Sequence, residues 1–211
     1  MDIRAIFEAA LLCELKEIAA NHPGMVASRN KLKIKQEKKV VAELFFDHLA
    51  RVDSYVLGGM VYGGPIFNCA SDFEPPYKSN LYNKGCFSFV TSGENSKRFS
   101  GGLCGVIKTP PPDLAGQVCD HIRSVLEEFY IPRMLGCIVP SERTIPDALM
   151  SPDDYAYPAV FIHCAMALNP KIASADILNE VISSKKVVKN EDYDLPLLVA
   201  DFVSSKRVHR F

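Results

Sequence analysis

The sequence predicts an α+β protein in which a central antiparallel, glycine-rich sheet is flanked by N-terminal helices and a helical C-terminal third. Strand-like segments rich in glycine gather between residues 54 and 108, and helical periodicity dominates after residue 158. Strands followed by a run of helices favour an α+β fold over an alternating parallel sheet. We expect a single domain over residues 1–211, with possible sub-lobes at 1–140 and 141–211.

Composition sets broad limits on function. The chain has 211 residues, 48% of them hydrophobic, so it can bury a core without metals or disulfides. Its formal net charge is −1, from 24 basic and 25 acidic side chains, which gives no long-range attraction to nucleic acid or membranes. The acidic N-terminal segment is unlike a secretory or transit peptide, and no apolar run is long enough to span a bilayer. We therefore expect a cytoplasmic protein.

Three elements are expected at the N-terminus. Asp2 can cap a helix over residues 3–20, where apolar side chains recur at helical spacing. Lysines then alternate with Leu32 and Ile34, which is the period of a half-buried strand. The alternating lysines are Lys31, Lys33 and Lys35. Residues 36–52 return to a helical period and predict a second helix.

The middle of the chain predicts a hairpin and then a helix. Strand-like segments on either side of Gly93–Ser96 suggest a turn there. Three prolines, 110–112, end this region because proline cannot donate to a strand ladder. Asp113 is expected to cap the helix that follows, and the apolar residues 134–140 to form a short strand.

The last third is expected to begin with a proline-rich acidic connector over residues 141–158. Three helical segments then follow, near residues 158–168, 174–184 and 195–205.

The stretch "VLGGMVYGGP" (56–65) contains two glycine pairs, which suggests either a phosphate-binding loop or a bent strand. A phosphate loop needs a helix immediately after it, whereas Pro65 and "IFNCA" predict none. Neither the Walker nor the dinucleotide spacing is present. We expect a tightly bent strand, or two short strands joined at Gly58-Gly59, with glycines that allow close backbone approach.

The cysteines are spread widely and most lie in apolar runs, so they are expected to be reduced and mostly buried. They are Cys13, Cys69, Cys86, Cys104, Cys119, Cys137 and Cys164. Small neighbours around Cys104 leave open a second possibility, in which this thiol is a nucleophile and His121 or His163 its base. Packing is the favoured interpretation, because only a lowered pKa would make the thiol reactive.

Metal and acid–base chemistry find little support. No two histidines are four residues apart, so the usual spacing of a helical metal site is missing. His163, in "FIHCAMAL", fits a buried structural histidine. No acidic pair is identified as catalytic. We expect neither a metal nor a cofactor.

The lysine strip of Lys31, Lys33 and Lys35 is the strongest candidate binding feature. It could hold phosphates or an acidic partner. Lysines on an edge strand also prevent sheets from associating, and the strip contains no aromatic residue for stacking on bases. Edge protection is therefore the favoured explanation.

The segment "FSFVTSGENSKRFSGGLC" resembles the hairpin near the start of DENN and longin-type trafficking modules. The residues that carry the resemblance are Phe87, Phe89, Val90, Arg98, Phe99 and Cys104. Gly101-Gly102 depart from that pattern, and the chain is too short for a complete DENN module. We assign no family from this segment.

A non-catalytic interaction or assembly protein is the favoured function, since no concentrated catalytic motif is present and exposed apolar surface usually serves partners. The first helix and residues 195–211 are expected to dock on a partner protein or on a second copy of the chain. A hydrolase or transferase using Cys104 is the first alternative. Binding of an anion or a nucleic acid by the lysine strip is the second.

Overall fold

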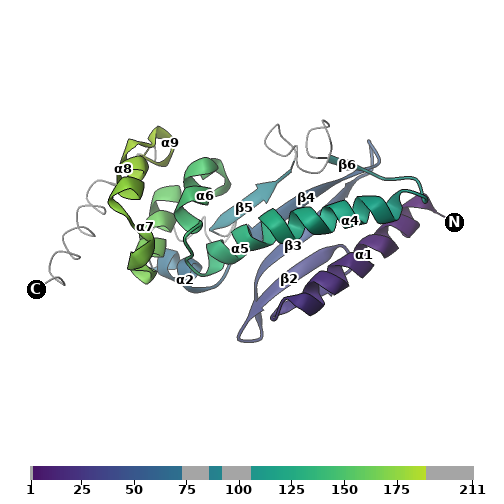
Figure 1. Cartoon of the computed structure of the whole chain (residues 1–211), viewed down its shortest axis with the longest axis horizontal. Coiled ribbons are helices and arrows are strands. Elements are labelled where there is room, and N and C mark those ends of the chain that lie inside the picture. The colour runs from purple at the N-terminus through teal and green to yellow at the C-terminus, as the bar shows by residue number, and fades with distance from the viewer. Residues whose placement is uncertain (1, 73–85, 92–105, 189–211) are drawn as a thin grey trace, which may run out of the picture. The chain divides into compact units, whose positions relative to one another are not determined.

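A computed structural model describes residues 2–72, 86–91 and 106–188. Its strands form one six-stranded antiparallel sheet and most of the remaining described chain is helical, which confirms the predicted α+β class (Figure 1). The strands are β1 (Met25–Ser28), β2 (Lys31–Gln36), β3 (Lys39–Leu49), β4 (Ser54–Val61), β5 (Phe87–Val90) and β6 (Val106–Lys108). The helices are α1 (Ile3–Asn21), α2 (Pro65–Ser71), α4 (Ala115–Val125), α5 (Ile131–Ile138), α6 (Thr144–Met150), α7 (Pro158–Leu168), α8 (Ala175–Ser183) and α9 (Lys185–Val188).

The chain forms two compact units. Unit 1 comprises residues 1–61 and 88–134, and unit 2 comprises residues 62–87 and 135–211. The chain therefore enters unit 2 twice. The expectation of a single domain, with possible sub-lobes at 1–140 and 141–211, stays a prediction.

The sheet of unit 1 corrects one prediction, because residues 36–52 do not form a helix. Strand β3 pairs with β2 on one side and with β4 on the other. Ala42, Leu44 and Phe46 are buried at the two-residue spacing of a strand. The neighbouring apolar doublets at 40–41 and 45–46 also satisfy a helical period, which explains the error. Between β2 and β3 the chain reverses at Glu37-Lys38, where φ is 48° and 69°.

Helices α1 and α4 lie side by side across one face of the sheet and run in the same direction (Figure 1). As predicted, the side chain of Asp2 caps α1 by accepting a hydrogen bond from the backbone N–H of Arg4, at 3.1 Å. Ion pairs from Arg123 of α4 to Glu14 and Glu17 of α1 join the two helices. The apolar stripe of α1 is fully buried in unit 1, so it does not offer the docking face expected of it. That stripe consists of Phe7, Leu11, Leu15 and Ile18.

The first glycine pair lies inside one continuous strand, so the alternative of two short strands joined at Gly58-Gly59 is wrong. The groups that come close to the two glycines are aromatic side chains. A Cβ on Gly58 would lie 2.4 Å from the ring of Phe45. A Cβ on Gly59 would lie 2.3 Å from the ring of Phe89, which stacks on Tyr130. Each glycine therefore makes room for an aromatic ring.

Helix α2 follows the second glycine pair directly, so the expectation that no helix starts at Pro65 is also wrong. Proline is favoured in the first turn of a helix, where its missing N–H would have no intrahelical partner. Gly64 precedes it with φ 96°, a conformation that favours glycine. Neither the Walker nor the dinucleotide spacing precedes α2, so the glycine pairs still do not indicate a phosphate-binding loop.

The described residues on either side of the predicted hairpin turn both pair with β4. The backbone N–H of Thr91, just after β5, donates to the carbonyl of Leu57, and Val106 at the start of β6 pairs with Val56. The two sides therefore follow each other along the same edge of β4, at successive residues, and the hairpin itself stays a prediction. The predicted turn at Gly93–Ser96 lies outside the described residues, as does most of the segment that resembles trafficking modules.

Residues 134–140 do not form the expected strand, since most of them belong to α5. This helix continues α4 through a π-helical turn at Leu126–Tyr130, just before Pro132. Proline inside a helix lacks one hydrogen bond and clashes with the preceding turn, so a local irregularity is expected there. Asp113 does not cap α4, because the N-cap position is Leu114 and no side-chain cap is formed.

Unit 2 is helical in its described part, and α7 is its most buried element. Eight of the residues of α7 are buried. The predicted helices near 158–168 and 174–184 correspond to α7 and α8, while the one near 195–205 lies outside the described residues. The expected connector contains α6 and a 3-10 turn, Pro152–Asp154.

We predict that Gly59→Ala destabilises the protein by about 2 kcal/mol, as overpacking does in other cores. The ring of Phe89 is buried and held against Tyr130, so it cannot move aside. Gly58→Ala should cost less, because Phe45 is only half-buried and its ring can shift. Urea unfolding measures both effects.

Gly116→Ala is the matched control for these substitutions. Nothing lies within 4 Å of a Cβ at this helical position, so alanine should be neutral or slightly stabilising. An equal loss of stability from Gly59→Ala and Gly116→Ala would contradict the packing explanation.

Candidate functional site

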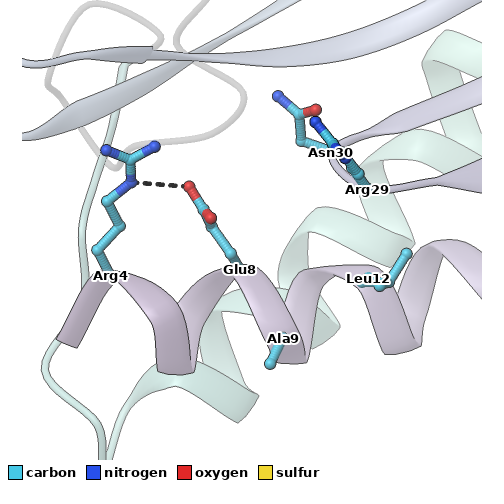
Figure 2. Close-up of a pocket in the computed structure, with 6 residues that line it drawn as sticks. All are labelled: Arg4, Glu8, Ala9, Leu12, Arg29 and Asn30. Atoms are coloured by element: carbon cyan, nitrogen blue, oxygen red, sulfur yellow. Dashed lines mark hydrogen bonds and ion pairs between the residues drawn. The ribbon is translucent and has the colours of Figure 1, made fainter. Parts of the chain in front are cut away.

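A pocket in unit 1 lies between the first half of α1 and the turn that joins β1 to β2 (Figure 2). Its volume is about 520 Å³, within the range of small-ligand sites. Arg4 and Glu8 extend from successive turns of α1, and Arg29 and Asn30 lie opposite them (Figure 2). The remaining lining residues, Ala9 and Leu12, add apolar surface.

A short chain of hydrogen bonds fixes the Arg4 side of the pocket. Arg4 Nε donates to Glu8 Oε1 at 2.8 Å, and the hydroxyl of Tyr55 on β4 donates to the same oxygen at 2.8 Å. Arg4 lowers the pKa of Glu8, so that this carboxylate stays ionised at neutral pH. Burial, followed by the bond to Glu8, raises the pKa of Tyr55 to about 12. The phenol is therefore a structural donor and not a proton acceptor.

The opposite side of the pocket is a tight turn. Asn30 is tied to β3: its side-chain amide donates to the carbonyl of Phe46, and its own carbonyl accepts from the N–H of Phe46 at 2.9 Å. Arg29 has φ 53°, in the left-handed region that is costly for a residue with a side chain. Backbone strain of this kind is found at ligand sites, where surrounding contacts hold it in place. The turn therefore holds Arg29 at the edge of the pocket.

A second polar group lies near the same end of α1. His48 Nε2 is 3.0 Å from Asp53 Oδ1, and the hydroxyl of Thr109 donates to that oxygen at 2.9 Å. Hydrogen bonds from His48 and then Thr109 lower the pKa of Asp53. The ring of His48 also packs on Tyr55, with centroids 4.9 Å apart. These contacts hold the turn between β3 and β4 against β6.

The lysine strip lies on β2 with the predicted alternation, since Leu32 and Ile34 are buried between its members. However, β2 pairs with β1 and with β3, so it is not an edge strand and protection of an edge does not explain the lysines. Lys31 forms an ion pair with Glu43 at 3.3 Å. Its Nζ also lies 5.4 Å from the ring centroid of Phe45. An aromatic ring is therefore adjacent to the strip, contrary to expectation.

The structure does not test the candidate thiol site. Cys104 lies outside the described residues. His121 is exposed on α4 in unit 1, and His163 is half-buried on α7 in unit 2. Four of the described cysteines are buried, in agreement with the expected packing role: Cys86, Cys119, Cys137 and Cys164.

The described residues contain no group of three or more histidine, cysteine or acidic side chains arranged to bind a metal ion. Within the same ranges, none of the helices combines the length and the apolarity that crossing a bilayer requires. Comparison of the chain with known protein families, curated proteins and solved structures finds no match.

The pocket and the Tyr55 network were not predicted from the sequence. Arg4 and Glu8 are four residues apart, which is a recognisable helical ion-pair spacing. Nothing in the sequence, however, places the turn at Arg29 above them. That proximity depends on the packing of α1 beside β1.

We predict that the Arg4–Glu8–Tyr55 network stabilises the fold above the ordinary Glu pKa of 4.5 and loses this effect in acid. The pKa of Glu8 is lowered in the folded protein, so its contribution disappears as the pH falls through that lowered value. Glu8→Gln should therefore unfold at lower urea than the parent at pH 7, and the two midpoints should converge as the pH falls below the lowered pKa of Glu8.

Glu180→Gln provides the control, since Glu180 is an exposed residue of α8 in unit 2. The urea midpoint of Glu180→Gln should equal that of the parent both at pH 7 and in acid. A difference in urea midpoint between Glu8→Gln and the parent that does not change with pH would contradict a stabilising role of the ionised Glu8 carboxylate.

Proposed function

We propose that this chain is a non-catalytic interaction module, and that the pocket in unit 1 receives an acidic side chain of a partner protein. One observation carries the proposal: two arginines from separate elements, Arg4 and Arg29, line one pocket beside apolar side chains. The partner is either another protein or a second copy of this chain.

The chemistry of the lining favours a carboxylate. A guanidinium binds carboxylate oxygens through paired, charge-assisted hydrogen bonds. The Glu8 carboxylate orients Arg4, while Arg29 is exposed and has no ion-pair partner among the described residues. The charged lining groups are thus two cations and one anion, which leaves a net positive charge. Ala9 and Leu12 would contact the methylene groups of a glutamate.

Acidic peptides test this proposal directly. A labelled hexaglutamate peptide should bind weakly and perturb the amide NMR signals around Arg4, Ala9, Leu12 and Arg29. Arg29→Ala should weaken binding about tenfold, because a hydrogen bond to a charged group contributes roughly 1.5 kcal/mol.

Arg51→Ala is the matched control, because Arg51 is also an exposed arginine in a turn of unit 1 but does not line the pocket. Equal weakening by the two substitutions, or NMR changes only at other sites, would contradict the proposal. Light scattering at several concentrations then distinguishes a separate partner from a second copy.

Binding of single-stranded nucleic acid by the lysine strip is a second candidate. It is favoured by the position of Phe45 beside Lys31, since a basic strip with an aromatic ring can hold both phosphates and bases. Lys33 and Lys35 are the lysines of the strip for which no ion pair is found among the described residues. Glu43 and Asp47 on the same side of β3 reduce the positive charge and oppose this function.

We predict that, if this second function holds, oligo(dT) binding weakens with salt at a log–log slope of about −1.4, as two phosphate contacts would give. Lys33→Ala should lower the slope by roughly 0.7. Phe45→Leu should weaken binding without changing the slope. Lys16→Ala is the control, because Lys16 is an exposed residue of α1, and it should change neither the affinity nor the salt slope. Binding that is independent of salt would remove this candidate.

A further inference from the structure

We propose that strand β1 pairs along its outer edge with an extended acidic segment of another protein, whose carboxylate enters the pocket of unit 1. This pairing rests on the proposed function of that pocket, and it defines the form in which the partner binds. Strand β1 is at the end of the strand order, and within the described residues β2 is the one strand that pairs with it. An end strand presents backbone groups to which a further strand can be added.

The hydrogen bonds between β1 and β2 determine which backbone groups of β1 face outward. The N–H of Lys35 donates to the carbonyl of Gly24 at 2.8 Å, so these two residues form a hydrogen-bonded pair. Such pairs alternate along an antiparallel ladder, so the next residues of this chain segment that bond to β2 are Val26 and Ser28. The N–H and the carbonyl of Ala27 consequently point away from β2, toward the outer edge.

The sequence of β1, MVAS, lacks features that usually protect an end strand from pairing. It contains no charged residue and no proline, and its register with β2 is free of bulges. The side chain of Val26 is 40% exposed, and Ser28 is exposed as well. The second half of the strand is therefore accessible to a partner chain.

The alternation of side chains connects this edge with the pocket. Ala27 lies opposite Leu32, which is fully buried, so both side chains are on the face of the sheet that α1 covers. A residue of an added strand that pairs with Ala27 has its side chain on the same face. Strand β1 ends at Ser28, and the next residue, Arg29, lines the pocket opposite Leu12 (Figure 2). Side chains at that end of the added strand are therefore directed toward the pocket.

Charge favours a separate acidic chain over a second copy of this protein. Arg4 and Arg29 line the pocket, and carboxylates complement guanidinium groups. If two copies paired in antiparallel fashion through β1, the residues of one copy near Arg29 of the other would be those that precede its β1, residues 22–24. These are histidine, proline and glycine, and none of them carries a carboxylate. A chain with an acidic residue at every second position complements both the edge and the pocket.

The test uses an octapeptide of alternating threonine and glutamate and measures amide hydrogen exchange in the full-length protein by NMR. Binding should slow the exchange of the Ala27 N–H, which gains a hydrogen bond to the peptide. Exchange of the Val26 N–H should not change, because this group is already bonded to β2. The amide signals of Arg4 and Arg29 should shift in the same titration.

N-methylated peptides provide matched controls. In antiparallel pairing, the residue opposite Ala27 exchanges both of its hydrogen bonds with Ala27 and shares its face, so this residue is a glutamate of the peptide. Methylation of the glutamate nitrogens should therefore weaken binding about tenfold, because it removes backbone hydrogen bonds. Methylation of the threonine nitrogens should leave the affinity unchanged. Equal affinity of the two methylated peptides would overturn the proposed pairing.

Ala27→Pro tests the same contact from the side of the protein. Proline is tolerated in an end strand where the N–H faces outward, so the variant should fold and lose peptide binding. If the variant does not fold, the methylated peptides decide the question alone.

The readouts distinguish failure of the edge pairing from failure of the pocket. Shifts at Arg4 and Arg29 without slower exchange at Ala27 would overturn the edge pairing and leave the pocket function standing. Slower exchange at Ala27 without those shifts would contradict the pocket function. Light scattering that shows a dimer in place of peptide binding would identify a second copy as the occupant and would also overturn the proposal.

Discussion

Strand β4 is the element on which the rest of unit 1 depends. It pairs with β3 along one edge, while β5 and β6 follow each other along its other edge. Nearly all of its residues are buried, so groups on both faces of the strand must fit closely. Glycine at 58 and 59 meets this requirement, because an added Cβ at either position would overlap an aromatic ring. The glycines that resemble a phosphate loop in the sequence are therefore a packing requirement of the sheet.

The same strand also positions the candidate binding pocket. Tyr55 of β4 donates to Glu8, and its ring packs on Phe7 with centroids 5.1 Å apart. These two contacts fix the side of α1 that faces the sheet. Arg4, one turn before Glu8, is consequently held at the pocket rather than free in solvent. A buried aromatic residue on a strand thus determines where a charged side chain on a helix can act.

Local patterns predicted the elements whose signals are confined to short segments. The helix capped by Asp2, the alternating strand of β2 and the helices α7 and α8 all follow from periodicity and capping. The errors arose where a pattern fits two structures. Residues 36–52 satisfy a helical period, and only the turn at Glu37-Lys38 and the pairing with β2 and β4 select a strand. Pairing partners are a tertiary property, so the pocket could not be predicted from the spacing of residues in the sequence.

Because β3 is a strand and not a helix, the case for nucleic-acid binding by the lysine strip also changes. As part of a helix, Phe45 would have no fixed position relative to the lysines, and the lysine strip would protect the edge of the sheet. As part of a strand, Phe45 pairs with Lys31, and β2 becomes an inner strand. The objection that stacking groups are absent is then removed, but Glu43 enters the same surface and pairs with Lys31. The acidic side chain offsets what the aromatic ring adds, which is why the two-arginine pocket remains the better-supported candidate.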